Sequence, residues 1–76
     1  MKVKNYDNNR IIEAADKRLY LTSLNNKKVE KEYVSDFEIN TFEKLNDNLT
    51  FIGGRKGQLG VVDFRNTKEL LWKPLT

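Results

Sequence analysis

The two halves of the chain resemble each other at a spacing of about 40 residues. Residues 9–30 align with residues 48–70; the offset is 39 residues as far as Gly57, which has no counterpart, and 40 residues beyond it. The aligned pairs are Asn9 with Asn48, Ile12 with Phe51, Ala14-Ala15 with Gly53-Gly54, Lys17 with Lys56, Leu19 with Leu59, Leu21 with Val61, Leu24 with Phe64, Asn26 with Asn66, Lys28 with Lys68 and, upstream, Val3 with Phe42. The alternative is a chance similarity between two strand-rich stretches. A true repeat constrains the fold strongly, because each half must then form the same kind of unit.

Eight short segments rich in β-branched and aromatic residues alternate with turn signals along the chain. They span residues 2–6, 10–15, 18–24, 27–34, 37–42, 49–53, 59–64 and 69–72. Clusters at Asn8-Asn9, Asn25-Asn26 and Asn46-Asp47-Asn48 separate several of them, and Asn and Asp favour tight turns. Strands of this length at this spacing predict an all-β fold. With the repeat, they predict two four-stranded antiparallel units of about 40 residues, one over 1–34 and one over 35–76.

One segment also fits a helix. Ser35 is followed three residues later by Glu38, which is a capping-box pattern, so that residues 35–46 could form a short helix. In the competing strand interpretation, the residues that share one face are Phe37, Ile39 and Thr41. The repeat favours the strand.

The composition argues against catalysis. The 76 residues suffice for one domain at most, and they include no Cys and no His. Disulfides, zinc–thiolate sites, Ser-His-Asp triads and imidazole general bases are therefore excluded. We expect a protein that is not an enzyme and that uses no cofactor, no metal and no small-molecule substrate.

The charge balance permits a nucleic-acid partner without requiring one. There are 14 Lys and Arg residues against 11 Asp and Glu, a net charge of +3, and the two signs are interspersed. No apolar run approaches the roughly 20 residues of a membrane span. The first residues contain no apolar core of a signal peptide. We therefore expect an intracellular protein, cytoplasmic or nuclear, that does not bind membranes.

The second half carries a more specific motif. Asp47-Asn48 stands at a first turn, Gly53-Gly54 ends the following strand with small residues, residues 55–57 form the next turn, and Val62-Asp63 closes the third strand. This order resembles the body of a WD40 repeat, in which a Trp-Asp pair closes the third strand. Here a Val replaces the Trp, and the first half has Thr22-Ser23 at that position. No Gly-His dipeptide occurs, so the His–Asp hydrogen-bond network typical of the family cannot form.

The resemblance implies that each half is one blade of a β-propeller that acts as a protein-interaction scaffold. The adjacent Val61 and Val62 fit a strand that neighbouring blades cover on both faces. Propellers typically have about four to eight blades, whereas this chain has sequence for two. Other chains or further copies of this chain would complete it, because open sheet faces and edges promote association. The alternative is a small β-barrel that binds nucleic acid through its basic turns.

Six residues are candidates for partner binding: Lys17, Arg18, Arg55, Lys56, Asp63 and Arg65. The first four lie in or beside equivalent hairpin turns, which a propeller would place on one rim, and exposed turns on a rigid scaffold commonly bind partners. In the nucleic-acid alternative, the same turns together with Arg10 and Tyr20 would contact phosphates and stack on bases.

Two further features of the second half have both a functional and a structural interpretation. Asp63-Phe64-Arg65 is similar to the Trp-Asp-x-Arg box of WD40 substrate receptors for cullin-type ubiquitin ligases, in which the Arg contacts the ligase adaptor. Otherwise the Asp and the Arg are ordinary polar residues at the end of a strand. Trp72, the only Trp, either packs against the fold or anchors an interface.

Overall fold

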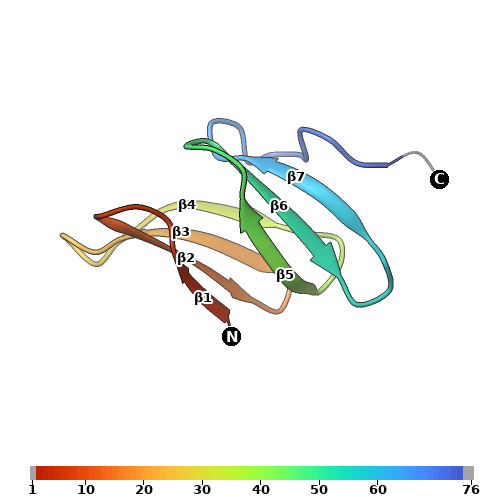
Figure 1. Ribbon diagram of the computed structural model, residues 1–76, viewed down its shortest axis with the longest axis horizontal. Helices are drawn as coiled ribbons and strands as arrows, with labels where there is room; N and C mark the ends of the chain where they lie inside the picture. Colours follow the sequence, from red (N-terminus) through yellow and green to blue (C-terminus); the bar gives the residue numbers. More distant parts are fainter. Residues whose placement is uncertain (1, 75–76) are drawn as a thin grey trace.

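The computed structural model describes residues 2–74 and consists of two antiparallel β-sheets (Figure 1). Sheet A has four strands in the order of the chain: β1 (Lys2–Asn5), β2 (Arg10–Ala15), β3 (Arg18–Ser23) and β4 (Val29–Val34). Sheet B has three: β5 (Ile39–Lys44), β6 (Leu49–Gly54) and β7 (Leu59–Asp63). The prediction of an all-β fold is confirmed. The alternative of a closed barrel is wrong, because the strands form two separate open sheets.

The first seven predicted strands form, but the eighth does not. Residues 69–72 make only an isolated bridge, in which the Val61 amide donates to the Trp72 carbonyl at 2.9 Å and the Leu71 amide donates to the Val61 carbonyl at 2.8 Å. Two residues later, Pro74 has no amide hydrogen with which to extend the pairing. The prediction of a four-stranded second unit is therefore wrong: sheet B has three strands and a single bridge where the fourth would lie.

The segment at 35–46 is a turn followed by a strand, not a helix. The Ser35 hydroxyl accepts a hydrogen bond from the Phe37 amide at 3.1 Å, two residues on, whereas a capping box would engage the amide three residues on. The prediction for one face of the strand is also wrong. A register shift between Ile39 and Thr41 turns Ile39 and Phe42 toward the core and leaves Thr41 exposed.

The Asn-rich clusters form the expected turns between strands. The Asn46 side-chain oxygen accepts hydrogen bonds from the amides of Asn48 and Leu49, at 2.9 and 3.0 Å.

The turn between β2 and β3 has two residues and begins with Asp16. The φ of Asp16 is 57°, a left-handed conformation that Asp tolerates better than most residues. The short turns fix the register of the strands that they join.

The core lies between the two sheets. Along β3 buried and more exposed residues alternate, as expected for a strand with one covered face. The buried apolar side chains are Tyr6, Ile12, Ala14, Leu19, Leu21 and Tyr33 from the first half and Ile39, Phe42, Ile52, Val62 and Phe64 from the second. Within residues 2–74 no helix is present that could cross a membrane.

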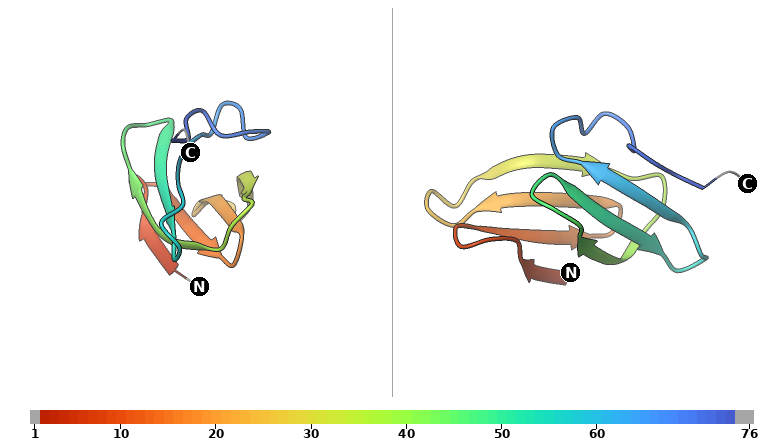
Figure 2. Two further views of the ribbon diagram at one scale, coloured as in Figure 1. Left: turned by 90° about the vertical axis from the view of Figure 1, so that its right-hand side faces the viewer. Right: turned by 45° about the horizontal axis from the view of Figure 1, so that its top comes forward.

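The sheets meet closely along β1 and β5 and diverge toward β4 (Figure 2, left). At the close edge, the Lys4 ammonium donates to the Phe42 carbonyl at 3.0 Å and to the Glu43 carboxylate at 2.7 Å. At the wide edge, residues 66–73 cross over the opening. Leu70 packs there against Gly60, where an added Cβ would lie 2.7 Å from a Leu70 methyl carbon.

Candidate interaction surfaces

The face of sheet B that points away from sheet A carries an apolar row. Phe51 pairs with Val61 across β6 and β7, and Val61 bridges to Trp72. These side chains point away from the core because their neighbours Ile52 and Val62 are the residues that point into it. We call this surface the B outer face and define it by Leu49, Phe51, Leu59, Val61 and Trp72.

The B outer face is open to solvent. Trp72 is 49% exposed and Leu59 38%, while Phe51 and Val61 are half-buried. Gly53 keeps the face flat between them, since an added Cβ would lie 2.9 Å from the Thr41 methyl carbon. Exposed apolar patches on small domains are candidates for binding surfaces, and the B outer face is one such candidate.

The opposite outer surface, on sheet A, mixes apolar and polar side chains. We call it the A outer face and define it by Val3, Ile11, Glu13, Tyr20 and Thr22. The Thr22 hydroxyl donates to the Glu13 carboxylate at 2.9 Å, so the central polar groups of this face satisfy each other. Beside them, Arg18 and Glu32 form an ion pair at 2.6 Å.

Four of the six predicted partner-binding residues lie at one end of the molecule. The Ile39 amide donates to the Asp16 carbonyl at 2.8 Å, and Ile39 also pairs with Gly54. The β2–β3 turn, with Lys17 and Arg18, therefore lies at the same end as the β6–β7 turn. We call this the basic end, and define it by Lys17, Arg18, Arg55 and Lys56.

Acidic neighbours offset part of the basic end. The Glu32 carboxylate raises the pKa of Arg18 through a hydrogen bond. The Arg55 guanidinium lies 3.9 Å from the Glu38 carboxylate, across a shallow pocket that Phe37 and Lys56 also line. Asp16 stands in the same turn as Lys17, and Asp36 lines the same pocket, so the basic end presents a surface of mixed charge.

The other two predicted residues lie at the opposite end. Asp63 pairs with Leu49, at the far end of β6 from Gly54. Arg65 folds back on it, with Nε 3.0 Å from Oδ1 and Nη2 2.9 Å from Oδ2, and the Arg65 amide also donates to Oδ1 at 2.9 Å. These hydrogen bonds lower the pKa of Asp63. The Arg65 side chain stays 65% exposed, so one edge of its guanidinium remains open to a partner.

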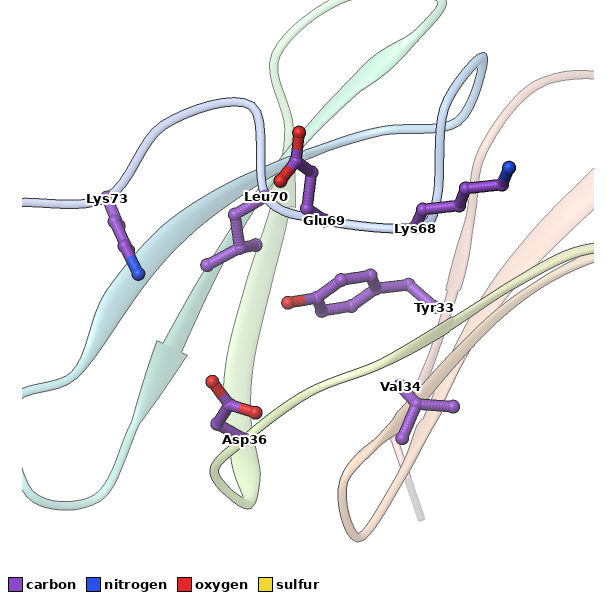
Figure 3. Close-up of a pocket in the computed structure, with 7 residues that line it drawn as sticks. All are labelled: Tyr33, Val34, Asp36, Lys68, Glu69, Leu70 and Lys73. Atoms are coloured by element: carbon purple, nitrogen blue, oxygen red, sulfur yellow. The ribbon is translucent and has the colours of Figure 1, made fainter.

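A pocket of about 210 Å³ lies at the wide edge between the sheets (Figure 3). Its lining residues are Tyr33, Val34, Asp36, Lys68, Glu69, Leu70 and Lys73. The Tyr33 hydroxyl points into it between Asp36 and Leu70 (Figure 3). Desolvation, together with the Asp36 carboxylate, raises the pKa of Tyr33. Across residues 2–74, no three His, Cys, Asp or Glu side chains gather in a way that could hold a metal ion.

Comparison of the chain with protein-family models, with curated proteins and with solved structures found no match. The surfaces described above therefore rest on the geometry of this molecule.

Sequence reasoning missed the B outer face as a unit. Phe51 and Val61 were visible as apolar members of the repeat, and Val61 next to Val62 indicated a strand covered on both sides. The pairing that joins them to Trp72 was not visible, because it depends on the path of the chain after Phe64.

Proposed function

We propose that this chain is a non-catalytic protein-interaction module, a WD40-like pair of propeller blades whose B outer face receives a protein partner. The observation that carries the proposal is the solvent-facing row of Phe51, Val61 and Trp72. A few buried residues, Trp among the most frequent, supply most of the binding free energy of a protein interface, and this row offers such a cluster.

The arrangement of the strands supports the blade interpretation. In a propeller the first strand of each blade is innermost, and the chain passes from the outer strand of one blade to the inner strand of the next. Here β1 and β5 lie side by side, joined through Lys4 and Glu43, and residues 35–38 lead from β4, at the wide edge, to β5. The sheets diverge outward from that contact (Figure 2).

The ends of the two sheets add polar specificity to this apolar surface. The Arg65 guanidinium stands at one end, beside Asp63, and the basic end stands at the other. Charged groups at the edge of an interface steer association and set orientation more than they add affinity.

A second candidate function is nucleic-acid binding through the basic end. The observation in its favour is that Lys17, Arg55 and Lys56 come from two turns at the same end, with the half-buried Phe37 between them. Binding of this kind would weaken steeply as salt rises, because it depends on counterion release from phosphates.

The test uses affinity capture with matched variants. Val61→Lys places a charge in the middle of the B outer face, and Asn8→Lys adds the same charge in an exposed turn away from it. We expect protein partners to be retained by wild type and Asn8→Lys and lost with Val61→Lys, with all three chains folded by circular dichroism. Capture of nucleic acid that falls with salt and ignores Val61→Lys would favour the second candidate instead.

A further inference from the structure

We infer that the partner on the B outer face is the A outer face of a second copy of this chain, so that copies assemble head to tail. This inference rests on the proposed function, whose binding surface it uses. It depends on a relationship between the sequence repeat and the two sheets.

The residues that sheet A turns toward the core have counterparts that sheet B turns away from it. In the repeat, four core residues of sheet A correspond to four residues on the outer side of sheet B: Ile12 to Phe51, Ala14 to Gly53, Leu19 to Leu59 and Leu21 to Val61. The inner face of sheet A, which sheet B covers, and the B outer face, which no other sheet of the chain covers, are therefore built from corresponding residues.

The reverse relationship holds for the other pair of faces. The inward residues of sheet B correspond, at the same offsets, to the residues that define the A outer face: Phe42 to Val3, Thr50 to Ile11, Ile52 to Glu13, Gly60 to Tyr20 and Val62 to Thr22. A second copy that placed its A outer face on the B outer face would therefore set corresponding residues opposite one another as in the internal interface, with Tyr20 in place of Gly60 and Glu13 in place of Ile52.

Each contact between the two sheets of one chain predicts a contact between copies, in which each residue is replaced by its counterpart in the repeat. Tyr6 meets Phe64 across the internal interface, with ring centroids 5.8 Å apart. Their counterparts are Leu45 and Leu24, which are 55% and 48% exposed. The large side chains that would form this contact are therefore present, apolar and uncovered in the isolated chain.

Charge complementarity also carries over at the close edge. Inside the chain, Lys4 and Glu43 pair at 2.7 Å. At the offset of 39, the counterpart of Lys4 is Glu43 itself, so the matching contact between copies joins Glu43 of one copy to Lys4 of the next. The Lys4 side chain is 46% exposed and the Glu43 side chain 66%. In an assembly of copies, Lys4 on β1 and Glu43 on β5 would therefore alternate from one strand to the next.

The contact between copies would be weaker than the internal one. Glu13 stands where sheet B has Ile52, so the A outer face must bury a carboxylate that only Thr22 satisfies. Association is therefore expected to depend on concentration. A head-to-tail contact of this kind closes into a ring if the rotation permits, and about two to four copies would supply the four to eight blades of a propeller.

The experiment uses single-cysteine variants, since the chain has no Cys of its own. Leu24→Cys and Leu45→Cys are mixed in equal amounts and oxidised mildly, and the products are separated without reductant. The inference expects the mixed disulfide to exceed both symmetric ones. In the control mixture, Leu24→Cys with Leu59→Cys, the second cysteine stands at the other end of the same face, so no excess is expected.

Light scattering across a concentration series completes the test. Oligomers of wild type together with the selective 24–45 disulfide would support the inference. A folded monomer at every concentration, or an oligomer cross-linked chiefly as 45–45, would overturn it. If a monomer still retained a different protein that Val61→Lys released, the proposed function would stand while the second copy as its partner would not. If Val61→Lys changed neither capture nor assembly, the proposed function would fail as well.

Discussion

The Tyr6 ring meets the Phe64 ring edge to face, with the planes at 84° and the centroids 5.8 Å apart. This contact joins the loop after β1, in sheet A, to the residue after β7, in sheet B. The Tyr6 hydroxyl also reaches across to sheet B, where it donates to the backbone carbonyls of Asn46, at 3.1 Å, and Asp47. Tyr6 therefore holds the two sheets together through both its ring and its hydroxyl.

The first prediction removes only that hydroxyl. Tyr6→Phe keeps the edge-to-face contact and leaves two inter-sheet carbonyl acceptors without their donor, so we expect a loss of about 1–2 kcal/mol in the free energy of unfolding. Urea unfolding followed by circular dichroism measures it. Tyr20→Phe, on the A outer face, is the matched control and should change stability little. Equal effects of the two variants would contradict the role assigned to Tyr6.

The second prediction concerns alkaline pH. Desolvation raises the pKa values of Tyr6 and Tyr33 above the ordinary tyrosine value of 10.0. The unfolded chain therefore loses these protons first as the pH rises, and ionisation favours unfolding. The contribution of these two tyrosines to stability should be constant below pH 10.0 and be lost as the pH rises through their raised pKa values. The urea midpoint as a function of pH tests this, and a steeper decline in Tyr6→Phe than in wild type would refute it.

The third prediction concerns acid. Hydrogen bonds from Arg65 lower the pKa of Asp63 below its ordinary value of 3.8, so the folded state favours the ionised carboxylate. The stabilisation is present above pH 3.8 and is lost as the pH falls through the lowered pKa. Asp63→Asn removes this dependence, and its urea midpoint should therefore change less on acidification than that of wild type. An unchanged acid profile would show that the pair with Arg65 does not affect stability.

The fourth prediction concerns a buried hydroxyl. Thr50 is 0% exposed. Among residues 2–74 its Oγ1 has no hydrogen-bond partner within the usual limits, although it lies near the Tyr6 phenol. Replacing a buried hydroxyl that lacks a partner by a methyl group of the same shape removes a desolvation cost. Thr50→Val should therefore raise the free energy of unfolding by about 1 kcal/mol. A loss of stability instead would mean that the hydroxyl bonds to Tyr6 in solution.

Local patterns in the sequence predicted much of the fold. Alternating apolar residues placed β2, β3, β6 and β7 within about two residues of their bounds, and the Asn clusters placed the turns. The misses depend on non-local pairing. The bulge after Ile39 is set by how β5 pairs with β6, and the loss of the eighth strand is set by the course of the chain beyond Phe64. Neither the bulge nor the missing strand is marked by a periodic pattern of apolar residues in the sequence.

The candidate site was predicted less well than the fold, for the same reason. Turn residues such as Lys17 and Lys56 could be expected at one end, because both follow the second strand of an aligned unit. That Asp63 and Arg65 belong to the other end follows from strand direction and could have been derived. The row that joins Phe51 to Trp72 could not have been derived from the sequence, since it depends on the bridge between Val61 and Trp72.

The fifth prediction tests that bridge through Gly60. A Cβ at this position would lie 2.7 Å from one Leu70 methyl carbon and 3.0 Å from the other, so Gly60→Ala must displace Leu70. Leu70 precedes the two residues that bridge to Val61, and its displacement should free Trp72 from the B outer face. We expect a loss of about 1–3 kcal/mol and greater quenching of the single Trp by iodide. Gly57→Ala is the control: it meets no atom within 4 Å, but its φ of +82° makes Ala costly there. It should lose stability without changing the quenching of Trp72. Equal quenching in the two variants would show that Leu70 does not hold Trp72 in place.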